Sequence, residues 1–424
     1  MTIALPDEVG FSYRGNDLYC EGVAIAAIVE RFGTPTFVYS RRAITQAFEA
    51  YSAALSGRRA MVCYAMKANS NLAVLDVLAR LGAGFDIVSG GELARVIAAG
   101  GSPDKVVFSG VGKTEDEIEQ ALAADIFCFN VESAAELDRI DAVARRARRH
   151  ARVSVRVNPD VDPRTHPYIS TGLKDNKFGV GPEETLALYR SASTRPGVEM
   201  SGIDCHIGSQ ITEIEPYLNA ADRLLDLVEA IDGLGIRLDH IDFGGGLGIR
   251  YAEETPPDPT QLVRALLQRV DARGFADRTL LIEPGRSIVG NAGILVTRVE
   301  YLKRTEVRSF AIVDAAMNDL LRPTLYDAWM GIVPVQMRPG AAERYDVVGP
   351  VCESGDWLAH DRSLALLSGD LLAVTGSGAY GMAMSSNYNT RARAAEVMVD
   401  GDRAYEVRRR ETIAELFAGE SILP

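Results

Sequence analysis

The stretch AMVCYAMKAN, residues 60–69, begins with the apolar run Ala60 to Cys63 and carries Lys67 shortly behind it. A short apolar run of this kind is typical of a buried strand. A lysine at the end of such a strand, held among apolar neighbours, loses part of its charge through desolvation, and its amine can then form a Schiff base with a carbonyl. The alternative is an ordinary lysine at the start of a strand-to-helix loop, which is the commoner case for a lone lysine.

The chain around this stretch alternates between β-rich runs and helical patterns. Eight strands are predicted, at Met61–Tyr64, Gly84–Val88, Val106–Ser109, Ile126–Asn130, Val153–Val157, Met200–His206, His240–Phe243 and Thr279–Glu283. Seven helical patterns separate them, at Leu72–Leu81, Gly91–Ala99, Glu115–Ala123, Ser133–Arg149, Pro182–Ser193, Tyr217–Leu234 and Pro259–Arg273. Apolar strands alternating with helices predict a parallel sheet, and eight such units predict a closed (β/α)8 TIM-type barrel. An open doubly wound sheet is the alternative, but no Gly-rich dinucleotide fingerprint follows the first strand.

A second, mostly antiparallel β domain is predicted after Pro284, where the alternation with helices stops. The β-rich runs there are Ile294–Tyr301, Ser309–Val313, Arg344–Val348, Leu371–Val374, Ala395–Val399 and Arg403–Val407. Residues 1–35 read as irregular and are expected to pack with this domain, and a helix is predicted from Arg41 to Leu55. We therefore predict a barrel domain at 36–290, and a β-sandwich or barrel-like domain formed by 1–35 and 291–424.

The composition of the 424 residues, 47% hydrophobic and 24% charged, is that of an ordinary globular protein. The net charge of −13 argues against a nucleic-acid surface and against an anionic membrane partner, since both need concentrated Lys and Arg. The five cysteines are widely spaced and odd in number, so neither a disulfide framework nor a metal site is indicated. The N-terminus lacks a signal-peptide pattern and no apolar run reaches membrane-spanning length, so we expect a cytoplasmic protein.

The C-terminal ends of the strands form the active-site face of such a barrel. The residues at these ends are polar, although the strands are otherwise apolar. In order they are Lys67, Asp86, Ser109, Asn130, Arg156 with Asn158, His206, Gly244 to Gly246, and Glu283. Any one of them could be a satisfied structural group, but polar residues at all eight ends predict a binding site.

Three features of this face together indicate pyridoxal phosphate. The glycines Gly244, Gly245 and Gly246 follow the seventh strand, where barrels often bind phosphate, although a flexible turn is the alternative. Glu283, in the motif EPGR at 283–286, would pair with the pyridine nitrogen of the cofactor, unless it forms a salt bridge with Arg286. With Lys67 as the Schiff-base amine, His206 could lie on the face of the ring, the alternative being a core histidine.

Six motifs in this order resemble those of the diaminopimelate decarboxylases, a family within the barrel-type pyridoxal-phosphate group that also includes ornithine and arginine decarboxylases and, more distantly, alanine racemase. They are YAMKAN at 64–69, CHIGSQ at 205–210, GGG at 244–246, EPGR at 283–286, CESGD at 352–356 and GAYG at 378–381. The resemblance extends from about Phe37 to Val399. It implies loss of carbon dioxide from meso-2,6-diaminoheptanedioate to give L-lysine, the last step of lysine biosynthesis.

The resemblance also implies a role for individual residues. Lys67 would hold the cofactor, His206 would stack on its ring and Glu283 would pair with its nitrogen, with Cys352 as the proton donor and Lys67 or water as alternatives. The remaining cofactor-binding residues are Asp86, Ser209, Gly244, Gly245, Gly246, Gly285, Arg286 and Tyr380. The loop from His166 to Gly179 resembles a family loop that covers the site, and the length of the segment from Asn158 to Gly181 without a clear helix independently fits a lid.

The choice of substrate is expected to depend on charge. Diaminopimelate carries an amine and a carboxylate at its far end, so its site needs both an anion and a cation. By resemblance Arg286, Arg322 and Tyr326 would bind the distal carboxylate, with Tyr380 beside them, and Glu353 would bind the distal amine. A surface ion pair is the alternative for Arg322. Family members are homodimers with shared active sites, so Cys352 and Glu353 would serve the neighbouring subunit, and the β domain would contribute to substrate binding and to the dimer interface.

Two stretches depart from the family pattern. Residues 391–397 read RARAAEV where the family often has RPRPAEV, and Asp327 to Met330 replaces a more usual Tyr-His pair close to Tyr326. Two other functions are therefore considered. One is a decarboxylase of ornithine, arginine, lysine or carboxynorspermidine on the same scaffold. The other is a regulatory protein that binds the cofactor without catalysis, which the presence of Lys67, Glu283 and Cys352 argues against.

Overall fold

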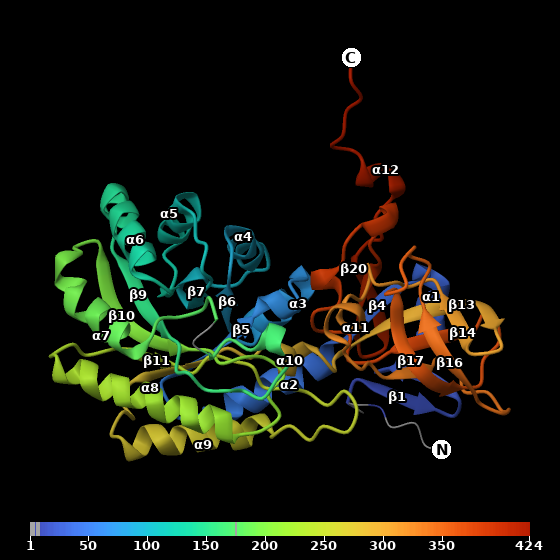
Figure 1. The fold of residues 1–424 in the computed structure, drawn as a ribbon, viewed down its shortest axis with the longest axis horizontal. Coiled ribbons are helices and arrows are strands. Elements are labelled where there is room, and N and C mark those ends of the chain that lie inside the picture. The colour runs from blue at the N-terminus through green and yellow to red at the C-terminus, as the bar shows by residue number, and fades with distance from the viewer. Residues whose placement is uncertain (1–4, 6–8, 174–175) are drawn as a thin grey trace. The chain divides into compact units, whose positions relative to one another are not determined.

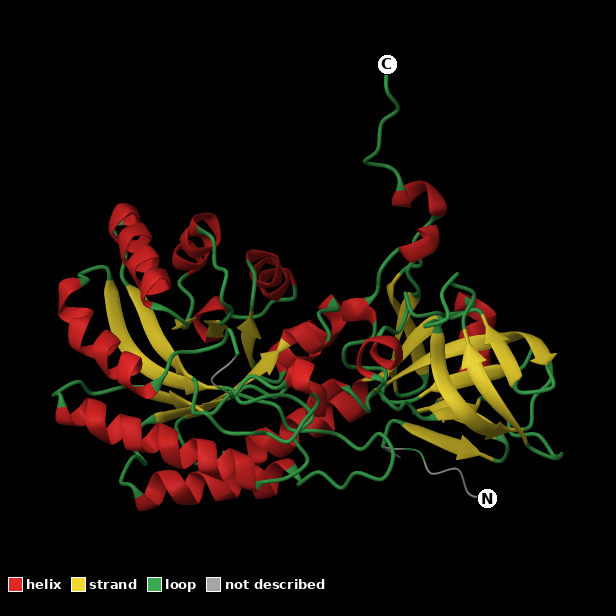
Figure 2. Cartoon of the chain, viewed as in Figure 1, coloured by secondary structure: helices red, strands yellow, loops and turns green. Residues whose placement is uncertain are grey.

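The computed structural model describes residues 5, 9–173 and 176–424 of the chain, which divides into two compact units. The barrel unit consists of Ala47–Ile249 and Thr255–Ser287. The β unit consists of Met1–Gln46, Arg250–Glu254 and Ile288–Pro424. Both are labelled by element in Figure 1 and coloured by secondary structure in Figure 2.

The barrel unit contains a closed barrel of eight parallel strands, as predicted. The strands are β5 (Ala60–Ala65), β6 (Gly84–Ile87), β7 (Val106–Phe108), β8 (Cys128–Val131), β9 (Ala151–Val157), β10 (Val198–Cys205), β11 (His240–Asp242) and β12 (Thr279–Ile282). Strand β12 pairs with β5 in parallel and so closes the ring. Each observed strand lies within two residues of its predicted bounds, because the apolar runs mark strands that are buried on both faces.

Seven helices connect these strands and cover the outside of the barrel (Figure 1). They are α3 (Leu72–Arg80), α4 (Gly90–Ala98), α5 (Glu115–Ala124), α6 (Ala134–Ala147), α7 (Pro182–Ser191), α8 (Glu215–Gly233) and α9 (Pro259–Ala272). Capping residues in the sequence determine where several of these helices begin. Thr114 and Glu117 form a capping box at the start of α5, and Ser89 and Ser133 accept backbone N–H groups at the starts of α4 and α6.

The centre of the barrel is filled by small and branched side chains. Cys63, Val107, Cys128 and Leu281, from four different strands, form one buried cluster. Because apolar side chains fill this level, the polar residues lie beyond it, at the C-terminal ends of the strands.

The β unit contains a nine-stranded, largely antiparallel sheet, as predicted. Its strands are β4 (Thr36–Ser40), β13 (Gly293–Arg304), β14 (Ser309–Val313), β15 (Ile332–Pro334), β16 (Glu343–Val348), β17 (Trp357–Leu364), β18 (Leu371–Val374), β19 (Ala395–Asp400) and β20 (Arg403–Arg408). Two pairs are parallel, β4 with β19 and β14 with β16. The remaining α-helices of the described residues are α1 (Ile25–Phe32), α2 (Arg41–Ala54), α10 (Arg286–Val289), α11 (Arg322–Tyr326) and α12 (Ile413–Leu416).

The prediction that residues 1–35 are irregular is wrong. The described part of this segment forms a small sheet of β1 (Phe11–Arg14), β2 (Asp17–Cys20) and β3 (Val23–Ala24), followed by α1. A two-residue turn joins β1 to β2, with Gly15 at φ +63°. The sequence Gly15-Asn16 between two β-rich runs is a hairpin signal, but the runs are only four residues long. Short strands of this kind depend on tertiary packing, here against the core of the β unit around Val38.

No helix within the described residues is both long enough and apolar enough to span a lipid bilayer.

Candidate active site

Lys67 lies in a 3-10 turn, Met66–Ala68, immediately after β5. Its Nζ atom is 2.5 Å from Oδ2 of Asp86, on the neighbouring strand β6. Asp86 is buried, whereas the Lys67 side chain keeps 35% of its surface exposed. Lys67 was expected among apolar neighbours, and strand pairing also brings the carboxylate of Asp86 to its amine. This ion pair holds the amine at the open end of the barrel.

The three glycines after β11 approach other backbone segments closely. Gly244 and Gly246 have φ values of +63° and +110°, which favour glycine. A Cβ atom on Gly245 would lie 1.9 Å from the carbonyl oxygen of Glu283. The loop is thus packed against the end of β12, and a side chain at Gly245 would not fit. This close packing argues against a merely flexible turn.

His206 directly follows β10, and its Nδ1 accepts a hydrogen bond from the N–H of Gly245 at 3.2 Å. Burial lowers the pKa of His206 well below its usual value, and the positive charges of Arg156 and Lys67 lower this pKa further. The imidazole is therefore neutral at physiological pH. Because Nδ1 is an acceptor, the proton of the neutral ring is on Nε2.

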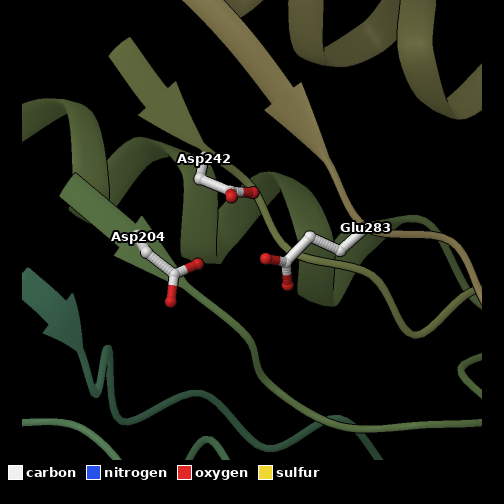
Figure 3. Close-up of side chains that lie close together, drawn as sticks. All are labelled: Asp204, Asp242 and Glu283. Atoms are coloured by element: carbon white, nitrogen blue, oxygen red, sulfur yellow. The ribbon is translucent and has the colours of Figure 1, made fainter. Parts of the chain in front are cut away.

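Three carboxyl groups meet at the ends of β10, β11 and β12, as Figure 3 shows. They belong to Asp204, Asp242 and Glu283, and one oxygen of each lies within 4.8 Å of the others. All three residues are buried. We call them the carboxyl triad.

Burial raises the pKa of each member of the carboxyl triad, and neighbouring carboxylates add to this effect. The pKa of Asp242 is raised to about 7, mainly by burial. Burial first, and then the charge of Asp242, raises the pKa values of Asp204 and Glu283 well above the usual range. These three groups therefore do not all ionise at neutral pH.

Only Glu283 of the carboxyl triad was predicted from the sequence. Asp204 and Asp242 were missed because the prediction took His206 and the glycines from Gly244 at these two strand ends, and passed over the carboxylates two positions earlier. A carboxylate inside an otherwise apolar strand was the available signal, since such a group is rarely buried without a role.

Arg156, on β9, lies beside the carboxyl triad. Its Nη1 is 3.1 Å from Oε1 of Glu132, and its Nε is 3.9 Å from Oδ2 of Asp204. Glu132 also accepts the N–H groups of Gly110 and Gly179. Arg156 was predicted at a strand end, whereas Glu132 was missed because it follows β8 by one residue.

Two loops supply further polar groups at the mouth of the barrel. Nη2 of Arg286, at the start of α10, donates a hydrogen bond to Oγ of Ser209 at 3.0 Å. Gly285 precedes Arg286, and a Cβ atom there would lie 3.0 Å from the carbonyl oxygen of Ala65. A cation, a hydroxyl and closely approaching backbone thus converge, which suits an anionic group.

The segment between Asn158 and Gly181 contains only a short 3-10 turn, Pro167–Ile169, among its described residues. This segment lies beside the residues that follow β10. The Thr171 hydroxyl donates to the carbonyl of His206 at 2.8 Å, and the N–H of Ser209 donates to the carbonyl of Ile169. Residues 174 and 175 of the predicted lid lie outside the described residues. The lid role stays a prediction, but the loop is anchored to His206 and Ser209.

Five of the predicted site residues belong to the β unit, namely Arg322, Tyr326, Cys352, Glu353 and Tyr380. Arg322 and Tyr326 begin and end α11. The buried Arg322 guanidinium stacks on the ring of Tyr251 at 4.4 Å and donates to Sδ of Met330 at 3.1 Å.

Cys352 and Glu353 lie in the loop that precedes β17. The Cys352 thiol is exposed, and its backbone N–H donates to Oδ1 of Asn389 at 3.2 Å. Glu353 accepts a hydrogen bond from the hydroxyl of Tyr388. Tyr380 has a φ of +55°, an uncommon conformation for a non-glycine residue. The structure thus groups the predicted cofactor residues of the barrel unit, while the predicted substrate residues other than Arg286 belong to the β unit.

Comparison with known proteins confirms the resemblance found in the sequence. The family model described as "Pyridoxal-dependent decarboxylase, pyridoxal binding domain" matches residues 41–290. The chain is 61% identical to the diaminopimelate decarboxylase of Pseudomonas aeruginosa, over 98% of this chain and 99% of the relative. It is 54% identical to the enzyme of Vibrio cholerae, over 98% and 99%.

Solved structures agree with these relatives. The diaminopimelate decarboxylase of Helicobacter pylori complexed with L-lysine has a TM-score of 0.89 at 42% identity, covering 93% of this chain and 98% of that one. The diaminopimelate decarboxylase of M. jannaschii in complex with L-lysine has a TM-score of 0.94 at 36% identity, covering 99% of both chains. The chain thus contains a pyridoxal-phosphate-binding barrel, and it belongs to the diaminopimelate decarboxylase family of carboxy-lyases.

Proposed function

We propose that Lys67, His206 and Glu283 carry the chemistry by which this decarboxylase converts meso-2,6-diaminoheptanedioate into L-lysine and carbon dioxide. The observation that supports this most directly is the convergence of an amine, a neutral imidazole and a carboxyl group on one open barrel end. When bound there, pyridoxal phosphate supplies an electron sink for the electrons left by the departing carbon dioxide.

The groups at the barrel mouth fit this cofactor. Lys67 offers the amine for a Schiff base, and its contact with Asp86 keeps the amine in position. Oε1 of Glu283 is buried and accepts no hydrogen bond from the described residues, so it can accept one from a protonated ring nitrogen. A neutral His206 can lie against an aromatic ring without adding a positive charge.

The phosphate would be held by the polar groups beyond the ring. Gly244, Gly245 and Gly246 have no room for side chains, so their backbone could lie close to an anion. The N–H groups of Gly244 and Gly245 donate to Asp242 and His206 and fix the loop, so Gly246, with a φ of +110°, is the glycine assigned to the phosphate through its N–H. Ser209, Gly285, Arg286 and Tyr380 complete the set. Support for Arg286 comes from its hydrogen bond to Ser209, which fixes the guanidinium beside this region.

Binding of the distal end of the substrate is assigned to residues of the β unit together with Arg286. Arg322 and Tyr326 would bind the distal carboxylate, and Glu353 would bind the distal amine. The Arg322 guanidinium is already oriented by Tyr251 and Met330, which lowers the entropic cost of a bidentate contact with a carboxylate. Cys352, exposed beside Glu353, would donate the proton that replaces carbon dioxide.

The stretch Asp327 to Met330, which departs from the family pattern, includes a residue that contacts Arg322 directly. Met330 accepts a hydrogen bond from Arg322 through its sulfur, and its carbonyl accepts one from Arg362 at 2.9 Å. Arg362 in turn stacks on Trp329 at 4.2 Å. The residues that differ from the family pattern therefore brace the guanidinium, and we expect them to preserve the preference for a distal carboxylate.

We also propose a cytoplasmic homodimer with shared active sites. Support comes from the motifs shared with homodimeric family members and from the placement of Cys352 and Glu353 in an exposed loop. In such a dimer these two residues would face the partner subunit's Lys67.

Arg322→Gln should lower kcat/KM for meso-diaminopimelate by about 30-fold or more, chiefly by raising KM, because a charged hydrogen-bond partner of the distal carboxylate is lost. Steady-state kinetics measure this effect. Arg338→Gln is the matched control, since Arg338 forms an exposed ion pair with Asp370 in the same unit. An unchanged KM in Arg322→Gln would remove Arg322 from the substrate site.

A further inference from the structure

We propose that Asp242 is a positioning residue that shares a proton with Glu283, and that Asp204 completes this hydrogen-bonded group. The proposal rests on the assignment of Glu283 to the ring nitrogen. It adds two residues, Asp204 and Asp242, that the proposed reaction does not otherwise use.

The first support is the geometry of the carboxyl triad. Carboxyl oxygens of Asp204, Asp242 and Glu283 all lie within 4.8 Å of one another, and the three side chains point toward each other in Figure 3. Three ionised carboxylates at this separation would repel strongly in a buried environment. A proton shared between two of them removes one charge and supplies a hydrogen bond in its place.

The second support is the shortage of donors around the triad. Oδ1 of Asp242 accepts the N–H of Gly244 at 2.8 Å. Oδ2 of Asp242, Oε1 of Glu283 and Oδ1 of Asp204 are buried and accept no hydrogen bond from the described residues. Buried polar atoms are normally paired. A proton on one carboxyl group forms a hydrogen bond between two of these oxygens. One oxygen of Glu283 is then left to accept a hydrogen bond from the ring nitrogen of the cofactor.

The third support is the balance of charge near the triad. The cations that act on it are Lys67 and Arg156, and each has a carboxylate of its own, Asp86 for Lys67 and Glu132 for Arg156. The other titratable neighbours are His206, which is neutral, and the buried thiols of Cys63, Cys128 and Cys205, whose pKa values are raised by burial. Nε of Arg156 also lies 3.9 Å from Asp204, but the two cations are outnumbered by Asp86, Glu132 and the three triad members. Part of the negative charge of the triad is therefore uncompensated unless it binds protons.

The arrangement gives Asp242 a defined task. A protonated carboxyl shared with Asp242 orients the side chain of Glu283, and Asp242 is itself oriented by the backbone of the glycine loop through Gly244. The loop assigned to the phosphate and the carboxyl assigned to the ring nitrogen are thus joined through one residue. Loss of the Asp242 carboxyl should change the protonation of the site and not only its stability.

The test follows the protonated carboxyl groups of the full-length chain by infrared spectroscopy as a function of pH, before and after loading with pyridoxal phosphate. The wild-type chain without cofactor should keep a carboxylic-acid carbonyl band above pH 7. Asp242→Asn should shift the midpoint of this band to lower pH by at least about one unit, because a like charge is removed. In the loaded protein, the pH midpoint of the visible absorbance of the bound cofactor should also shift.

Asp319→Asn is the matched control. Asp319 is equally buried and has a pKa raised to about 6, mainly by burial, but it belongs to the β unit. This variant should leave both midpoints unchanged, so a shift confined to Asp242→Asn excludes a general effect of removing a buried carboxyl. If Asp242→Asn fails to fold, Asp204→Asn and the wild-type titration serve in its place, and Asp204→Asn should also lower the midpoint.

Two results would overturn the proposal: a wild-type chain whose carboxyl groups are all ionised above pH 7, or a midpoint that neither Asp242→Asn nor Asp204→Asn moves. Failure of the underlying assignment gives a different result. If Glu283→Gln leaves the visible spectrum of the bound cofactor unchanged, Glu283 does not contact the ring nitrogen, whatever the titration of the cofactor-free chain shows.

Discussion

Lys67→Ala should remove the Schiff-base absorbance of the loaded protein and lower kcat by on the order of a thousandfold or more, because the amine assigned to the Schiff base is lost. The amine of Lys67 is the group that Asp86 holds at the end of β5. Visible absorbance with added pyridoxal phosphate, together with carbon dioxide release, measures both effects.

Lys105→Ala is the control for this change. Lys105 lies in the same unit, directly before β7, and donates to the carbonyl of Gly82 at an exposed position away from the C-terminal ends of the strands. It should leave absorbance and turnover at wild-type levels. A Lys67→Ala protein with an unchanged spectrum would show that the cofactor is attached elsewhere.

Glu283→Gln should lower kcat by roughly a hundredfold, because a neutral amide stabilises a protonated ring nitrogen less well than a carboxylate does. The same change should stabilise the cofactor-free chain at alkaline pH. The pKa of Glu283 is raised in the folded state by burial and by neighbouring carboxylates. The folded chain therefore binds more protons than the unfolded chain between the usual pKa of a glutamate and the raised value, and the stability of the wild type falls as pH rises through that window.

Thermal unfolding at pH 5 and pH 8 tests this second effect. The melting temperature of Glu283→Gln should exceed that of the wild type at pH 8, and the difference should shrink at pH 5, where the wild-type carboxyl is protonated. Glu229 lies at an exposed position on α8 and forms an ion pair with Arg273, so Glu229→Gln should show neither effect. A Glu283→Gln protein less stable than the wild type at pH 8 would contradict the assignment of a raised pKa.

The barrel could be predicted because its signal is local. Each of the eight strands is an apolar run bounded by turn residues, and the connecting helices have strong periodicity and caps such as Thr114 and Ser133. The small N-terminal sheet and β17 were missed for the opposite reason. β17, with the sequence WLAHDRSL, mixes polar and apolar residues without a clear alternation, so only its pairing with β16 defines it.

The active site could be predicted in part. Lys67, His206, the glycine loop and Glu283 follow strand ends and belong to recognisable motifs. The partners of these residues depend on how neighbouring strands align, which the sequence does not state. The pairing of β5 with β6 brings Asp86 to Lys67, and the alignment of β10, β11 and β12 brings Asp204 and Asp242 to Glu283.

The most direct test of the central claim is carbon dioxide release from meso-diaminopimelate by the purified full-length chain, with and without added pyridoxal phosphate. Ornithine, arginine, lysine and carboxynorspermidine serve as competing substrates in parallel. We predict release from meso-diaminopimelate that depends on pyridoxal phosphate and far exceeds release from the other four. Release that is independent of the cofactor, absent, or equal or greater with a substrate lacking the distal carboxylate would contradict the account.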